Sequence, residues 1–164
     1  MAVTVIKLEE LVQGDYQRLC QIAVLKPVPL DIYEIVENSQ EHTPHGMLRS
    51  YPYAGYDKKV IYLPFHDAEL DMFFETAPPF LPQPNQWDMR FNHVWPKWRT
   101  DLWHEVIHQY EDQVLHLWKG DNSHGESWRL ATDEVAAKLG VPSVFIKNIA
   151  WGIAVPIIGG GSAR

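Results

Sequence analysis

The sequence predicts an α+β protein, and two patterns lead to this prediction. Apolar residues recur with helical spacing near the start of the chain and again in its last third. Between these regions lie short runs rich in β-branched and aromatic residues, bounded by glycine and proline. A length of 164 residues with 46% apolar residues suits a sizeable core, so we expect residues 1–164 to form one domain.

The first part of the chain is expected to be helical. Apolar spacing predicts a helix over residues 4–25, with a break at Gly14-Asp15 where Asp15 would cap a second piece. A short helix is predicted within residues 29–38, PLDIYEIVEN, because its isoleucines and valine fall on one helical face. Residues 1–50 would then form a helical N-terminal part.

The next segment is expected to contain a small antiparallel sheet or hairpin. Residues 45–65 carry β-rich runs on both sides of Ala54-Gly55, a dipeptide suited to a hairpin turn. Residues 66–75, HDAELDMFFE, then predict a short helix with Asp67 as its candidate cap.

A connection rich in proline and aromatic residues follows, over residues 76–95. Loops of this length inside a domain are often binding loops or lids. The alternative is a covered surface loop whose apolar side chains tuck into the core: Trp87, Met89 and Phe91.

Two longer helices are predicted after this connection. The first begins between Pro96 and Thr100 and should end at Gly120. Its expected core-facing residues recur every four positions: Trp98, Leu102, Val106, Tyr110, Val114 and Trp118.

The second helix opens with SHGE, in which Ser123 and Glu126 have the spacing of a capping box, and it should end at Gly140. Its apolar face is expected to consist of Trp128, Ala131, Val135 and Leu139. Residues 156–164 read as a flexible tail.

Composition excludes several classes of protein. The net charge of −7 argues against broad nonspecific nucleic-acid binding. Cys20 is the only cysteine, so neither an intramolecular disulfide nor a thiolate zinc ribbon is expected. The N-terminus lacks a signal-peptide core, and no stretch approaches the ~18 continuous apolar residues of a membrane span. We therefore expect a cytoplasmic protein without a membrane segment, while its oligomeric state stays open.

The most informative motif is His104-Glu105-x-x-His108 in the first of the two longer helices. Positions i and i+4 lie on one helical face, so both imidazoles can face one metal ion. Glu105 is rotated by about 100° from His104, which suits a general base acting on metal-bound water rather than a ligand. The alternative is a solvated helix face on which these residues, together with Glu111, are merely polar.

A third ligand would separate these two readings. His116 lies about 12 Å beyond His108 along the helix, too far to reach the same ion. The metzincin spacing needs Gly and His where this chain has Glu111 and Val114. His124 is the best remaining candidate, because the turn before it can fold the second helix back and Gly125 leaves room beside the metal. Oxygen donors on the same stretch remain as alternatives: Asp121, Glu126 and Glu134.

The other histidines are expected to be ordinary polar residues, His93 in the long connection being the least certain. They are His42, His45, His66 and His93.

The two stretches HEVIHQYED and NSHGESW resemble the pattern of the SprT-like zinc metallopeptidases. The resemblance covers roughly residues 57–140 and implies a zincin-like fold, with the motif helix and the following helix packed on a small sheet. It implies that Zn²⁺ is held by His104, His108 and His124, with Glu105 as the base. Trp128 occupies the family's aromatic position.

The resemblance also implies a strand that can pair with an extended peptide, a role that Lys58 to Pro64 could fill. This chain departs from some family members in lacking a cysteine zinc ribbon, and nothing in the N-terminal 50 residues matches the family. Neither charge nor motifs support the action on DNA-linked proteins of some relatives.

The expected function is therefore zinc-dependent hydrolysis of peptide bonds in a protein or peptide substrate. Candidate oxyanion donors are Tyr110, His93 and Arg99, and candidate acceptors that orient the imidazoles are Asp121 and Asp133. Three alternatives stay open: an ImmA/IrrE-type regulatory protein, a non-catalytic interaction module stabilised by a metal, and a protein that binds no metal.

Overall fold

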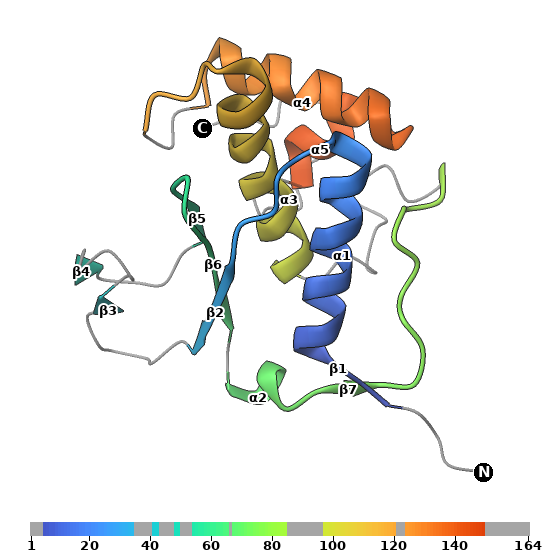
Figure 1. Ribbon diagram of the computed structural model, residues 1–164. Coiled ribbons are helices and arrows are strands. Elements are labelled where there is room, and N and C mark those ends of the chain that lie inside the picture. The colour runs from blue at the N-terminus through green and yellow to red at the C-terminus, as the bar shows by residue number, and fades with distance from the viewer. Residues whose placement is uncertain are drawn as a thin grey trace.

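Helices and short strands build an α+β architecture, which confirms the expected class (Figure 1). The computed structural model describes residues 5–34, 41–42, 48–49, 54–65, 67–84, 97–120 and 124–149. The helices are α1 (Leu8–Ala23), α2 (Asp67–Leu70), α3 (Lys97–Tyr110), α4 (Glu126–Leu139) and α5 (Ser143–Ile149). The strands are β1 (Ile6–Lys7), β2 (Leu30–Glu34), β3 (Glu41–His42), β4 (Leu48–Arg49), β5 (Gly55–Tyr56), β6 (Ile61–Phe65) and β7 (Phe73–Phe74).

Helix α1 is continuous from Leu8 to Ala23, so the predicted break at Gly14-Asp15 is wrong. Its apolar residues at i, i+3 and i+4 face the core, as helical periodicity requires. Asp15 lies on the same buried face and does not cap a helix. Its carboxylate receives two hydrogen bonds from Arg99, Nε to Oδ2 at 2.6 Å and Nη2 to Oδ1 at 3.1 Å.

The segment predicted as a short helix contains strand β2 instead. Residues Leu30–Glu34 pair in parallel with Ile61–Phe65, so β6 is the middle strand of a sheet ordered β2-β6-β5. The backbone of β2 thereby bonds to β6, and this pairing outweighs the local helical spacing. On its other side β6 pairs with β5 at Ile61 and Tyr62 only, so the expectation that Lys58 to Pro64 can pair with a peptide stays a prediction.

The predicted hairpin exists, but its turn lies further along the chain. Strands β5 and β6 are antiparallel, with Tyr56 opposite Ile61. The turn is built on Asp57, whose Oδ1 accepts hydrogen bonds from the backbone N–H groups of Lys59 and Val60. An aspartate that bonds two residues ahead is a common way to close a turn, and Ala54-Gly55 precedes this turn.

Two further pairings involve very short strands. Strands β3 and β4 are antiparallel. Helix α2 begins at Asp67, which is therefore its first residue and not its cap, and the following Phe73-Phe74 forms β7 and pairs antiparallel with β1.

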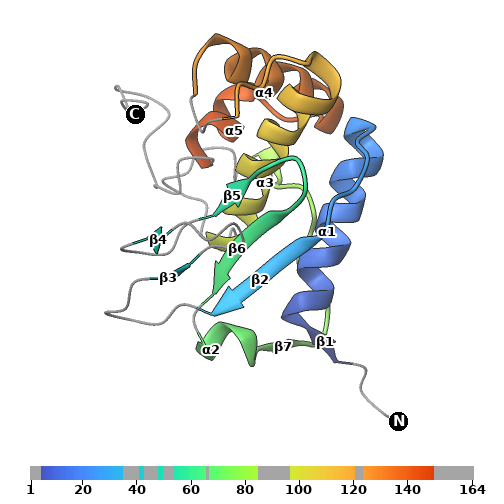
Figure 2. The ribbon, with the colours of Figure 1, turned by 60° about the vertical axis from the view of Figure 1, so that its left-hand side comes forward.

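Helix α3 lies at the centre of the fold, where it packs against α1, α4, α5, β5 and β6. Figures 1 and 2 show the three-stranded sheet along one side of α3 and α4 across its C-terminal end. Trp98, Leu102, Val106 and Tyr110 are buried, in agreement with the first part of the predicted stripe. A core on several sides of one helix fixes its orientation, and with it the orientation of its histidines.

The predicted helix end at Gly120 is wrong. Regular α-helix stops at Tyr110, a π-helical turn spans Glu111–Leu115, and His116 closes it in a left-handed conformation with φ of 56°. The wider turn rotates later side chains away from the stripe, which leaves Val114 37% exposed.

Helix α4 ends at Gly140, whose φ of 75° suits a glycine C-cap, as predicted. Its expected apolar face is also buried. The capping box is wrong, because the helix begins at Glu126 with Gly125 at the N-cap, so Glu126 is one position after the cap instead of three.

Several expectations fall outside the described residues. They concern the segment 85–96 with Trp87, Met89, Phe91 and His93, the positions His45, His66, Asp121 and Ser123, and the tail 156–164.

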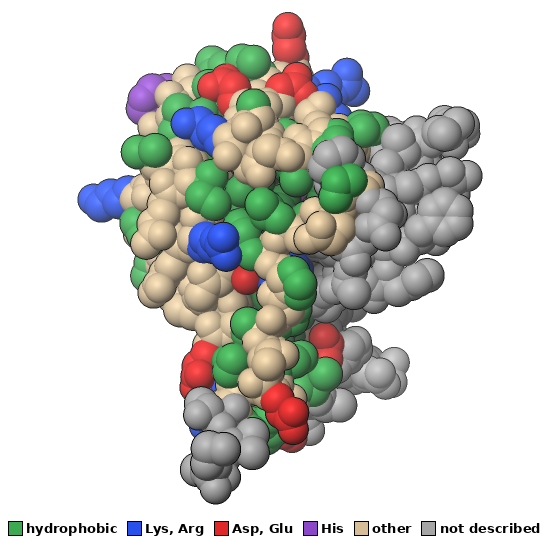
Figure 3. Space-filling view, turned by 90° about the vertical axis from the view of Figure 1, so that its right-hand side faces the viewer, with side chains coloured by type: hydrophobic (Ala, Val, Ile, Leu, Met, Phe, Trp, Pro, Cys, Tyr) green, Lys and Arg blue, Asp and Glu red, His purple; other side chains and the backbone are tan. Residues whose placement is uncertain are grey.

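Within the described part of the chain, no helix combines the length and apolar character needed to cross a bilayer. On the face shown in Figure 3, the Lys and Arg side chains are scattered among acidic ones and do not gather into a continuous basic surface.

Candidate metal centre

Three histidines from two segments converge in the structure. His104 and His108 come from α3. His124 directly precedes Gly125, the N-cap of α4, so it lies before the helix and not in its first turn as expected. One ring nitrogen of each can be chosen so that all three lie within 4.8 Å of one another. The structure thus brings together the three residues that the sequence singled out as zinc ligands.

The spacing of these nitrogens is compatible with a small ion. The Nε2 atoms of His104 and His124 are 2.8 Å apart. Two nitrogens bound to one tetrahedral zinc at ~2.05 Å would be about 3.3 Å apart, so an opening of roughly half an ångström accommodates the ion. His124 is partly exposed, which makes the cluster reachable from solvent on that side.

His108 is fully buried, and its two ring nitrogens have different environments. Nδ1 lies 2.8 Å from Oε1 of Glu111. The buried Nε2 of His108 has no hydrogen-bond partner among the residues that the structure describes. A buried polar atom normally has a partner, and a metal ion facing Nε2 would supply one. The donor set therefore fits zinc.

A second bond holds the Glu111 carboxylate. The hydroxyl of Ser127 donates to Oε2 of Glu111 at 2.6 Å, so each carboxylate oxygen has its own partner. Glu111 is 2% exposed. Sequence reasoning missed both residues as supports of the site, although Glu111 follows His108 by three positions and so lies on the same helical face.

Trp128 is the shared packing partner of the cluster. Its ring centroid lies 5.4 Å from that of His104, 6.3 Å from that of His108 and 5.1 Å from that of His124. The residue is 2% exposed. The aromatic residue expected from the motif thus contacts all three imidazoles.

Glu105 is buried, with 5% of the residue exposed, and it adjoins His104 in the middle of α3. A buried carboxylate is costly unless it is compensated by hydrogen bonds or by a nearby cation. Its position one residue after a candidate ligand suits a base that serves a metal-bound water.

Other predicted site residues have different partners. Arg99 binds Asp15 and also donates to the carbonyl of Pro79 at 2.9 Å, so its guanidinium already has partners in the fold. The Tyr110 hydroxyl donates to Oε1 of Glu134 at 2.9 Å, and burial together with that carboxylate raises the pKa of Tyr110 to about 12.

Asp133 does not support an imidazole, because its carboxylate pairs with Lys147 at 3.0 Å. Glu126 and Glu134 are not in the ligand cluster, where His124 takes the third place. A Cβ at Gly125 would meet no described protein atom within 4 Å outside its chain neighbours, so the expectation that glycine leaves room beside a metal stays a prediction.

The helix that carries the motif is anchored on its far side by glutamines. Gln109 accepts from the Tyr16 hydroxyl at 2.9 Å and donates to the carbonyl of Lys26 at 2.8 Å. Gln113 accepts from the Lys26 N–H at 2.8 Å and donates to the same carbonyl at 2.9 Å. These bonds fix α3 against the connection between α1 and β2.

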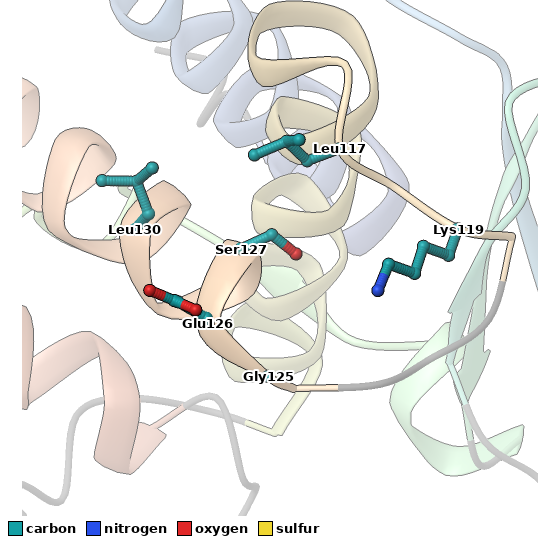
Figure 4. Close-up of a pocket in the computed structure, with 6 residues that line it drawn as sticks. All are labelled: Leu117, Lys119, Gly125, Glu126, Ser127 and Leu130. Atoms are coloured by element: carbon teal, nitrogen blue, oxygen red, sulfur yellow. The ribbon is translucent and has the colours of Figure 1, made fainter.

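A pocket of about 350 Å³ adjoins the start of α4 (Figure 4). Its walls mix two leucines with a cationic, an anionic and a hydroxyl side chain, and they consist of Leu117, Lys119, Gly125, Glu126, Ser127 and Leu130. Ser127 therefore belongs both to the pocket and to the hydrogen-bonded chain that leads to His108.

Comparison of the chain with protein-family models, with curated proteins and with solved structures finds no match.

Proposed function

We propose that the protein is a zinc-dependent peptidase with a zincin-like centre of the SprT-like kind. The observation that supports this most strongly is the convergence of His104, His108 and His124, whose ligand nitrogens lie within 4.8 Å of one another. A three-histidine set with a solvent-accessible side is the donor set of a catalytic zinc, which keeps a fourth position for water. A buried carboxylate, Glu105, adjoins the set.

Each residue has a distinct part in the proposed reaction. His104, His108 and His124 would hold the ion. When bound, zinc supplies a Lewis acid that lowers the pKa of water and polarises a carbonyl. Glu105 takes a proton from the attacking water and returns it to the leaving amine, the two halves of general acid–base catalysis.

The third histidine also bears on the alternatives. An oxygen ligand in third place would favour an ImmA/IrrE-type protein, whereas the cluster holds His124. A purely structural zinc site closes all four positions with protein groups, and the described residues contribute three. The histidine in third place supports the peptidase over the ImmA/IrrE-type protein, and the buried Glu105 supports it over the structural site.

The test combines metal analysis with proteolysis of an unstructured protein such as casein. We expect about one zinc per wild-type chain, markedly less in His124→Asn, and full zinc with lost proteolysis in Glu105→Gln. His116→Asn is a matched control for the first variant, because His116 lies outside the cluster and asparagine tolerates its left-handed backbone. Glu126→Gln is the matched control for Glu105→Gln.

Each outcome separates the candidates. A wild-type protein that binds no metal would exclude every metal-dependent function. If the wild type binds zinc but shows no proteolysis, and if Glu105→Gln leaves zinc binding unchanged, the result would favour the interaction module. Equal loss of zinc in His124→Asn and His116→Asn would show that the cluster is not the metal site.

A further inference from the structure

The carboxylate of Glu111 reaches the metal centre without belonging to it. It connects His108 on one side with Ser127 of α4 on the other, over 2.8 Å and 2.6 Å. His108 and Glu111 are fully buried, while Ser127 is partly exposed. A buried carboxylate with both oxygens engaged has a fixed orientation, and so has the imidazole that it contacts.

The direction of these bonds determines the form of His108. The Ser127 hydroxyl donates to one oxygen of Glu111, and an ionised carboxylate can only accept at the other. Nδ1 of His108 must then carry the proton in the neutral imidazole, which leaves the lone pair on Nε2. Nε2 is the buried ring nitrogen without a hydrogen-bond partner in the described structure.

The backbone places Glu111 independently of its side chain. Glu111 is the first residue of the π-helical turn, and its carbonyl accepts hydrogen bonds from the N–H groups of His116 and Leu117. The π-helical turn is also packed against α4, which brings Ser127 within reach. Single π turns in α-helices often occur at functional sites. Here the π-helical turn directly follows α3, which ends at Tyr110.

We infer that Glu111 and Ser127 are positioning residues that hold His108 as the Nδ1–H tautomer, with Nε2 directed to the metal, and thereby set the affinity for zinc. This inference rests on the proposed function in that it requires a metal centre at the three histidines. It goes beyond the proposed function because it assigns a role to Glu111 and Ser127, two residues outside the His104-Glu105-x-x-His108 motif.

The experiment measures zinc affinity by competition with a chromogenic chelator, using variants checked for folding by circular dichroism. Glu111→Gln should weaken zinc binding about 10–100-fold, the usual range for the loss of such a support. Ser127→Ala should weaken it less, and Ser127→Thr, which keeps the hydroxyl, should restore it. Glu126→Gln and Ser143→Ala should bind zinc like the wild type.

A second readout needs no metal. The ring ¹⁵N shifts of His108 in the metal-free protein report which nitrogen carries the proton. We expect the Nδ1–H form in the wild type and a mixture in Glu111→Gln, because an amide can either accept from Nδ1 or donate to it. A merely structural role of Glu111 would change stability without changing this signature.

The outcomes distinguish this inference from the proposed function. Unchanged zinc affinity in a folded Glu111→Gln overturns the inference alone, as does an Nε2–H form of His108 in the wild type. Zinc bound with the expected losses but without proteolysis overturns the peptidase and leaves the inference standing. A wild type that binds no zinc overturns both.

Discussion

The buried ion pair between Asp15 and Arg99 permits a quantitative prediction. Replacing Arg99 with methionine keeps much of the side-chain volume and removes the charge. The Arg99 side chain is 1% exposed and that of Asp15 is 11% exposed, so the remaining carboxylate has little access to water. The bond to the Pro79 carbonyl is lost as well.

Breaking a buried pair on one side costs about 3–5 kcal/mol, because a buried charge is left uncompensated. In a domain of this size 1 kcal/mol lowers Tm by about 2–4 °C, so Arg99→Met should lower Tm by about 6–20 °C. Removing both charges in Asp15→Leu/Arg99→Met should recover most of this loss, since the cost lies in the unpaired charge.

The loss should also depend on pH. Burial raises the pKa of the Asp15 carboxyl and Arg99 opposes that shift, so removing Arg99 raises the pKa further. The folded variant then binds its proton at a higher pH than the unfolded chain does, and its deficit shrinks as pH falls through the folded pKa. Thermal unfolding of wild type and variants at about pH 5 and about pH 8 measures this. A deficit equal at both values, or additive losses in the double variant, would refute the reasoning.

Three further expectations concern single positions. Burial raises the pKa of the Cys20 thiol, so a thiol reagent should label it at the rate of unfolding; fast labelling under native conditions would contradict its burial. A Cβ at Gly55 would collide with the Tyr62 ring, so Gly55→Ala should lose about 1–3 kcal/mol in urea unfolding. The loss should vanish in a Tyr62→Ala background, and its persistence there would point to another cause. Trp128→Ala should cost about 3–5 kcal/mol and weaken zinc binding, whereas unchanged zinc affinity would show that the ring does not order the imidazoles.

Local sequence patterns predict the three-histidine cluster better than they predict Glu111, which contacts His108, and Ser127, which contacts Glu111. His104 and His108 follow from helical spacing alone, and His124 from the turn that returns the chain to the motif helix. Glu111 carries a usable signal, three residues after His108, but the choice between it and an acidic residue such as Asp133 depends on where α4 packs. That packing brings Ser127 to the carboxylate, and spacing along the chain cannot reveal it.

The fold shows the same division between local and distant causes. The face of α4 and its end at Gly140 follow from periodicity and backbone chemistry. Strand β2 does not, because Leu30–Glu34 is compatible with either structure until β6 offers a parallel partner. The turn at Asp57 is local, because the carboxylate bonds residues two and three positions ahead, whereas the π turn at Glu111 packs against the distant helix α4.

The pair of Asp15 and Arg99 joins positions 84 residues apart, and Tyr16 and Gln109 join positions 93 apart. At about 5–20 residues per second, synthesis separates the two halves of the ion pair by roughly 4–17 s. Throughout that interval α1 lacks the helix against which it buries its charged and apolar residues. Helix α1 therefore cannot form its hydrogen bonds to α3 until the residues of α3 have been synthesised. A fragment that begins at residue 57 would carry all three histidines without α1 and its hydrogen bonds to α3.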